Sequence, residues 1–207
     1  MVTRRRKGVH HAPMSYAIPP APPVTLPVDG TDAVFPVLRV FCVGRNYAEH
    51  AVEMGHDPDR EPPFFFMKPA AAVVPNGGRL PFPPATDDLH HEVELVVAMR
   101  GGGADIGVDQ ALHHVFGYMV GLDMTRRDLQ AQAKEMGRPW DMAKGFDRSA
   151  PMGTLRTADD IGHPDAGAIW LRVNGELRQD GDLAQQIWKV RRRSPTSPRS
   201  LSCDRAT

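Results

Sequence analysis

The chain has 207 residues, enough for one domain with a hydrophobic core. Lys plus Arg and Asp plus Glu each number 25, so no net charge favours binding to nucleic acid or to an acidic membrane. No apolar run approaches the about 18 residues of a membrane-spanning helix, which excludes a helical membrane protein.

The first 37 residues are expected to form an extended, proline-rich segment. Residues 1–13 are basic, but no apolar stretch follows them as in a signal peptide, and Met14 is a candidate for the true start. The stretch PPAPPVTLP at residues 19–27 predicts a polyproline-like chain that lies on the surface rather than in the core.

Several stretches farther along the chain predict strands. They are rich in β-branched and aromatic residues and comprise VLRVFCVG (37–44), LVVAM (95–99) and VFGYMVGL (115–122). The segment AIWLRVNGELRQ (168–179) predicts a hairpin, because Asn174 and Gly175 suit a two-residue turn.

Helix signals are fewer and shorter. Asn46 can cap a helix that ends near Gly55. Thr125 and Asp128 can open a second helix, which Gly137 closes. Short helices among many strands, without a repeated βαβ spacing, predict a β-rich α+β fold.

Two glutamates lie two residues apart in HHEVELVV (90–97), a stretch with the alternation of a strand. Side chains at i and i+2 on a strand point to the same side, so Glu92 and Glu94 should be neighbours. A solvated strand face explains such a pair, as does a divalent cation that relieves the repulsion between the two carboxylates. A cation requires a third oxygen ligand from elsewhere in the chain.

Asp123 is a candidate for that ligand, because it follows the predicted strand 115–122 directly. A lone aspartate at this place is more often a turn or helix-capping residue. Together with Glu92 and Glu94, it would complete an all-oxygen set that suits Mg²⁺ or Mn²⁺ better than zinc.

Other residues have the chemistry of an active site. His50 and Glu53 share a helix face, either as a surface pair or as an imidazole that a carboxylate orients to act as a general base. Lys144 is either a surface cation or a fixed charge that faces a developing oxyanion. Arg127 and Gln130 lie on the second predicted helix, where most arginines are simply solvated.

Five motifs in chain order resemble the fumarylacetoacetate hydrolase family, and the resemblance covers residues 38–190. They are GRNYAEHAVEMG, EPPFFFMKPA, LHHEVELVVAM, GYMVGLDMTRRDLQ and GRPWDMAKGFDRSAPMG. The resemblance implies a fumarylacetoacetate hydrolase-type mixed β-sandwich roll as the catalytic domain. Several motifs in order are far more specific than any one of them alone.

The resemblance also implies roles for the candidate residues. Three carboxylates would bind Mg²⁺ or Mn²⁺, namely those of Glu92, Glu94 and Asp123. His50 and Glu53 would form the dyad that activates water.

The remaining roles concern the substrate. Lys144 would be catalytic, and Arg127 and Gln130 would hold substrate oxygens. The resemblance implies hydrolysis of a carbon–carbon bond in an acylpyruvate, a small diketo acid, and most closely of fumarylpyruvate to fumarate and pyruvate in aromatic catabolism through gentisate. An oxaloacetate decarboxylase, an enol–keto isomerase and an inactive remnant stay open as alternatives. Only Cys42 and Cys203 are present and no disulfide framework is apparent, which predicts a cytoplasmic protein. The resemblance implies a homodimer in the full-length form.

The C-terminal residues 191–207 differ from the rest in composition. They hold five Arg and one Asp without periodicity, which predicts disorder and is typical of a shifted reading frame. The resemblance implies that family members continue with further strands and a loop of the TGTPxGVG kind. We therefore expect the domain over residues 38–190 to lack its C-terminal part.

Overall fold

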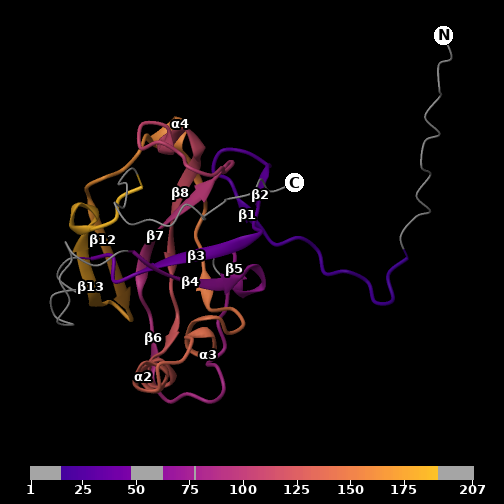
Figure 1. The fold of residues 1–207 in the computed structure, drawn as a ribbon, viewed down its shortest axis with the longest axis vertical. Helices are drawn as coiled ribbons and strands as arrows, with labels where there is room; N and C mark the ends of the chain where they lie inside the picture. Colours follow the sequence, from indigo (N-terminus) through magenta and orange to yellow (C-terminus); the bar gives the residue numbers. More distant parts are fainter. Residues whose placement is uncertain (1–14, 48–62, 77, 191–207) are drawn as a thin grey trace, which may run out of the picture.

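Figure 1 shows the computed structural model of the chain, in which residues 15–47, 63–76 and 78–190 are described. Short strands make up most of the regular structure, which confirms the predicted β-rich α+β class. The strands are β1 (Thr25–Pro27), β2 (Val34–Pro36), β3 (Arg39–Gly44), β4 (Phe64–Pro69), β5 (Val73–Val74), β6 (Leu89–His90), β7 (Val93–Met99), β8 (Val115–Leu122), β9 (Thr125–Arg126), β10 (Ala150–Pro151), β11 (Arg156–Thr157), β12 (Ala168–Val173) and β13 (Glu176–Asp182). The helices are α2 (Arg127–Glu135), α3 (Asp141–Lys144) and α4 (Ala158–Ile161), with 3₁₀ turns η1 (Ala70–Ala72), η2 (Ala111–His114) and η3 (Leu183–Gln185).

The middle of the fold is a three-stranded antiparallel sheet in the order β11-β8-β7. The predicted strand 115–122 is confirmed as β8, and the strand predicted at 95–99 is part of the longer β7. Because residues alternate along β7, Val93 packs with Ile169 and Leu183 on one side of the sheet. Ala98 joins a larger cluster on the other side. Both faces of the sheet are therefore covered by apolar packing.

Residues 15–23 are exposed and extended, and Figure 1 shows them running away from the body of the protein. The expectation that the whole stretch 19–27 stays on the surface is wrong, because Leu26 is 2% exposed and belongs to the larger cluster with Ala98. Val28, just after β1, is buried in the same cluster. The prolines give the stretch its extended form, whereas the side chains of Leu26 and Val28 turn inward.

The predicted hairpin at 168–179 is confirmed as β12 and β13. Asn174 and Gly175 have φ angles of 52° and 86°, the left-handed values that a two-residue type I′ turn requires. The hairpin lies along one side of the molecule in Figure 1. Its Gln179 side chain accepts a hydrogen bond of 2.7 Å from the Val93 amide, which ties the hairpin to the start of β7.

The second predicted helix is α2, for which the predicted C-terminus is correct and the predicted N-terminus is not. The C-terminus is confirmed: Gly137 has φ 61°, its amide donates to the Lys134 carbonyl, and the Arg138 amide donates to the Ala133 carbonyl. These two bonds form a Schellman motif. The N-terminus is wrong, because Thr125 lies in β9 and the helix begins at Arg127.

The predicted strand 37–44 is confirmed as β3, which starts at Arg39 and pairs with β4. Side chains alternate along each strand, so the β3–β4 pair has an outer, apolar face and an inner face. The outer face carries Phe41 and Met67, which are 37% and 46% exposed. The inner face carries Lys68, which is only 1% exposed.

The short helices α3 and α4 were not predicted, because four-residue helices have too little periodicity to recognise. Almost all of the helix predicted from Asn46 to Gly55 lies outside the described residues, as do residues 1–13 and the basic tail 191–207. Within the described ranges, no helix has the length and apolarity to span a membrane.

Candidate active site

The pairing of β7 with β8 brings the predicted carboxylates together. The Asp123 amide donates to the Glu92 carbonyl at 2.8 Å, so these residues lie opposite each other where the two strands meet. Glu94 pairs with Gly121 two residues farther along β7. Opposed residues on neighbouring strands point to the same side, and alternate residues on one strand do too. The three carboxylates therefore share one face of the sheet.

The prediction of one continuous strand over 90–97 needs correction. β6 ends at His90 and pairs with β9, whereas β7 begins at Val93 and pairs with β8. Glu92 therefore lies at an interruption between two strands. The interpretation of its face as simply solvated is also wrong, because Val96, on the same face, packs against the larger apolar cluster.

Gly121 makes room on this crowded face. A Cβ atom at this position would lie 2.6 Å from Val96 Cγ2 and 3.6 Å from Met152 Cγ. The first distance is too short for two carbon atoms, so any side chain would push Val96 away. The absent side chain therefore keeps the face beside Glu94 closely packed.

Lys144 brings positive charge into the carboxylate cluster. Its Nζ lies 2.7 Å from Glu92 Oε2 and 2.6 Å from Asp123 Oδ2, and its side chain is 3% exposed. Lys144 ends α3, whose N-terminal neighbour Trp140 accepts two main-chain hydrogen bonds of the turn. The structure thus excludes the interpretation of Lys144 as a surface cation. It is a buried charge at the centre of the site.

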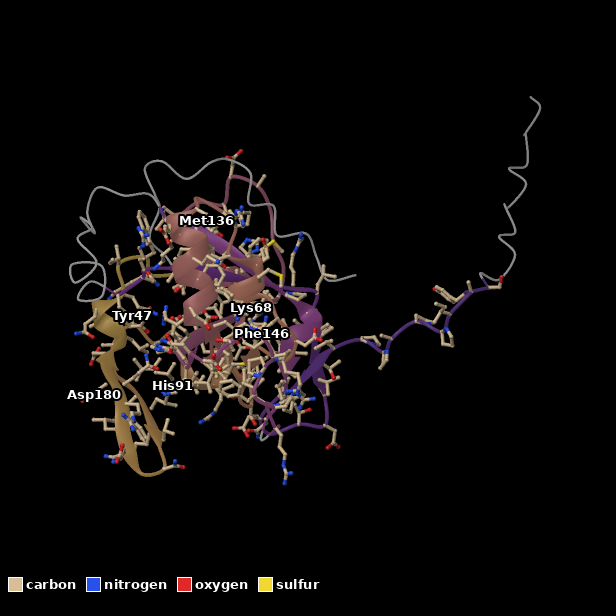
Figure 2. All side chains as sticks on the ribbon, turned by 90° about the horizontal axis from the view of Figure 1, so that it is seen from below. Tyr47, Lys68, His91, Met136, Phe146 and Asp180 are labelled. Atoms are coloured by element: carbon tan, nitrogen blue, oxygen red, sulfur yellow. The ribbon has the colours of Figure 1, made fainter. Side chains whose placement is uncertain are left out.

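Lys68 is a site residue that the sequence analysis missed. Its Nζ lies 2.8 Å from Asp123 Oδ1 and donates to the carbonyl oxygens of Met124, at 3.1 Å, and Lys144. Figure 2 shows Lys68 and Phe146 close together in the middle of the molecule, and the ammonium lies 5.8 Å from the Phe146 ring centroid. A lysine within the apolar run FFFMKP was the signal that could have revealed it.

Arg127 and Gln130 both lie beside the carboxylate cluster. Arg127 Nη1 donates to Gln130 Oε1 at 2.6 Å, and Nη2 lies 2.5 Å from Glu92 Oε1. Gln130 is 3% exposed. The structure therefore places the arginine between the carboxylate cluster and the amide, where a substrate carboxylate can exchange for one of these partners.

The charges of the cluster are unevenly compensated. Burial alone would raise the pKa of Glu92, but Lys144 and Arg127 outweigh it and hold this pKa at about 2. Burial, Glu92 and Asp123 raise the pKa of Glu94 to about 8, against the opposing effect of Lys144. The surroundings of Glu94 therefore favour an additional positive charge.

The carboxylates fit a hard divalent cation by their chemistry, because they offer only anionic oxygen ligands. In the part of the chain that the structure describes, no three His, Cys, Asp or Glu side chains already converge as a ligand set. The Lys144 ammonium instead lies between Glu92 and Asp123. The raised pKa of Glu94 indicates where further positive charge would be stabilised.

The remaining predicted pair, His50 and Glu53, lies outside the described residues. A cavity of about 1600 Å³ borders Glu92, Glu94, Asp123, Arg127 and Lys144. Its volume exceeds that of common ligand pockets, which run from about 300 to 1,000 Å³. A small diketo acid would fit beside the carboxylates.

Comparison with known proteins bears on this arrangement. A family model described as fumarylacetoacetate (FAA) hydrolase C-terminal matches residues 39–193. A crystal structure of fumarylpyruvate hydrolase from Pseudomonas aeruginosa, in complex with Mn²⁺ and pyruvate, is 56% identical with a TM-score of 0.81. The match covers 86% of this chain and 78% of that one.

Two curated proteins are more distant in sequence. The mitochondrial oxaloacetate tautomerase FAHD1 of Arabidopsis thaliana is 42% identical over 152 residues, which are 73% of this chain and 68% of that protein. The mitochondrial oxaloacetate decarboxylase of Dictyostelium discoideum is 39% identical over 153 residues, which are 73% of this chain and 70% of that protein.

Proposed function

The chain belongs to the fumarylacetoacetate hydrolase family, and on this premise we propose that it is a metal-dependent hydrolase that cleaves fumarylpyruvate to fumarate and pyruvate. The observation that carries the proposal is the cluster of Glu92, Glu94 and Asp123 with the Lys144 ammonium among them. The similarity to a fumarylpyruvate hydrolase, at 56% identity, supports the choice of substrate.

Mg²⁺ or Mn²⁺ is the proposed cofactor, and Glu92, Glu94 and Asp123 are the residues that would hold it. All three offer carboxylate oxygens, the ligands that both ions prefer. When bound, such an ion supplies a Lewis acid that polarises a carbonyl of the diketo acid. The similar fumarylpyruvate hydrolase from Pseudomonas aeruginosa, which was crystallised with Mn²⁺ and pyruvate, supports this assignment.

The remaining residues act on substrate and water. Arg127 and Gln130 hold substrate oxygens, since both side chains border the cavity. His50, oriented by Glu53, takes a proton from water, and the hydroxide adds to the distal carbonyl of the substrate. The carbon–carbon bond then breaks, its electron pair passes to the pyruvate half as an enolate, and that enolate takes up a proton. Lys144 stabilises the developing negative charge.

A second candidate is the conversion of oxaloacetate, by decarboxylation or by enol–keto isomerisation. The curated relatives at 42% and 39% identity favour it. Both activities also pass through an enolate next to a carboxylate, so the same charged residues would serve. The higher identity to the fumarylpyruvate hydrolase supports fumarylpyruvate over oxaloacetate as the proposed substrate.

A substrate comparison tests the proposal. With Mn²⁺ present, we expect kcat/KM for fumarylpyruvate to exceed that for oxaloacetate by at least about a hundredfold, because the site would stabilise only one of the two transition states fully. Loss of fumarylpyruvate absorbance and release of pyruvate measure the first reaction, and enol absorbance and carbon dioxide release measure the second.

Chelator-treated protein is the control in this comparison. A higher kcat/KM for oxaloacetate would transfer the assignment to the second candidate. Turnover of neither substrate by protein that binds Mn²⁺ would instead favour the inactive remnant.

We also propose that the protein forms a homodimer through the outer face of β3 and β4. Phe41 and Met67 lie on this face, together with Phe65, which is 36% exposed. An exposed apolar patch of this kind is typical of an interface between subunits. The proposal makes the β3–β4 pair a contact surface on its outer face and part of the active site, through Lys68, on its inner face.

Replacing Met67 by Glu should separate the subunits. A charge at the middle of an apolar interface is expected to raise the dimer dissociation constant at least about thirtyfold. Sedimentation velocity over a range of concentrations measures it. Leu177→Glu is the matched control, because Leu177 is 47% exposed but lies on β13. Equal dissociation constants for the two variants would exclude this face as the interface.

A further inference from the structure

We propose that Lys68 is a positioning residue of the carboxylate centre: its ammonium fixes both the Asp123 carboxylate and the main chain that carries Lys144. The inference rests on the proposed function, because it assigns Asp123 and Lys144 their roles in that reaction. It adds a residue from β4 that contacts Asp123 Oδ1, whereas Lys144 contacts Asp123 Oδ2.

The contacts of Lys68 indicate that it acts through other residues. An ammonium has three N–H donors, and three oxygens surround this one: Asp123 Oδ1 and the carbonyl oxygens of Met124 and Lys144. The side chain is 1% exposed. Two of these contacts are hydrogen bonds to main-chain carbonyl oxygens and the third is an ion pair with Asp123, so the ammonium acts on groups of the protein itself. Lys68 is therefore distinct from Lys144, which contacts two carboxylates directly.

Lys68 connects three separate segments of the chain. It extends from β4, binds the connection between β8 and β9 at Met124, and binds the last residue of α3 at Lys144. The Lys144 side chain then returns to Asp123 Oδ2 at 2.6 Å. The contacts form a closed ring, so a shift of the Lys68 ammonium would move both Asp123 and Lys144.

The same ring has a second support. Ser149 is fully buried, and its Oγ donates to the Lys144 carbonyl at 2.9 Å. This carbonyl thus accepts from both Ser149 and Lys68. Two donors on one main-chain oxygen hold the end of a four-residue helix that is too short to be rigid by itself.

Strand register explains why a lysine can occupy this position. Lys68 pairs with Val40 on the inner face of the β3–β4 pair, and its neighbour Met67 points outward. A buried ammonium is costly unless its donors are satisfied, and removing it would leave Asp123 Oδ1 and two carbonyl oxygens without that partner. The residue is therefore needed for geometry at the site as well as for charge.

The test compares Lys68→Met with Lys189→Met in the full chain. Lys189 is a half-buried lysine whose ammonium also donates to a main-chain carbonyl, that of Asp165, at 3.1 Å. We expect Lys68→Met to raise the Mn²⁺ dissociation constant by about 10- to 100-fold, as for other residues that orient metal ligands. Calorimetric titration of protein shown by circular dichroism to be folded measures it. We also expect a lower kcat with little change in KM for fumarylpyruvate, and no effect of Lys189→Met.

Unchanged Mn²⁺ affinity and unchanged kcat in folded Lys68→Met would overturn the proposal, even if the melting temperature fell. Lys68→Arg separates position from charge, because a planar guanidinium keeps the charge but cannot reproduce the three contacts. It should also bind Mn²⁺ more weakly. Full affinity in Lys68→Arg would show that charge suffices and would overturn the positioning role.

If the Lys68 variants fail to fold, chemical labelling of the unsubstituted chain still tests the proposal. Under limiting acetic anhydride, Lys189 should be acetylated and Lys68 protected, as peptide mass spectrometry can show. Equal labelling of both lysines would overturn the proposal. Unsubstituted protein that binds no Mn²⁺ would refute the proposed function, whereas tight binding by both it and Lys68→Met would refute only the role of Lys68.

Discussion

Replacing Glu94 by Gln is expected to weaken Mn²⁺ binding by at least about a hundredfold, since it removes one of the three anionic ligands. The metal-free fold should tolerate the change. Burial and the neighbouring carboxylates raise the pKa of Glu94 to about 8, so near pH 7 this side chain largely holds a proton and an amide has a similar shape and charge. Calorimetric titration with Mn²⁺ and a melting curve in chelator measure the two effects.

Glu176→Gln is the matched control for this experiment. Glu176 is an exposed glutamate on β13 that pairs with Arg178 at 2.6 Å, a contact that contributes little to stability. It should bind Mn²⁺ like the unsubstituted chain. Equal Mn²⁺ affinity in Glu94→Gln and Glu176→Gln would contradict the assignment of Glu94 as a ligand.

Replacing His50 by Ala is expected to lower kcat for fumarylpyruvate by about 10²- to 10⁴-fold, the usual contribution of a general base. The Mn²⁺ dissociation constant should stay unchanged, because an imidazole that acts on water does not belong to the carboxylate ligand set. Initial rates at saturating substrate and the calorimetric titration separate these properties. The two variants thus have opposite patterns: Glu94→Gln loses the metal, and His50→Ala keeps it.

A histidine outside the site serves as the control. His113 lies in η2, is exposed and contacts Gln110 at 3.0 Å. His113→Ala should retain the full rate. A His50→Ala variant with more than about a tenth of the original kcat would remove His50 from the role of base.

Local sequence patterns were sufficient for several parts of the fold. The apolar run 115–122 and the Asn174–Gly175 turn were placed correctly because strand composition and turn geometry depend on neighbouring residues. The shared face of Glu92 and Glu94 follows from alternation alone, whichever strand pairs with it. These features require no knowledge of distant contacts.

Other features depend on contacts that the local pattern does not contain. Lys68 and Asp123 are far apart in sequence, and their ion pair exists only because β4 and the end of β8 meet in the fold. Leu26 follows four prolines within nine residues, a composition typical of surface segments, yet tertiary packing buries it. Thr125 has the chemistry of a helix cap, but pairing with β6 makes it part of a strand.

The close approach at Gly121 also restricts how this site can change during evolution. A methyl group there would require space that Val96 now occupies, so the two positions cannot vary independently. Gly121→Ala should be tolerated only with a smaller residue at position 96, and the order in which the two mutations arise then matters. Residues 121 and 96 therefore form an epistatic pair directly beside Glu94, which restricts how the site can adapt to a new substrate. Substitutions should accumulate more readily at positions where side chains already have room.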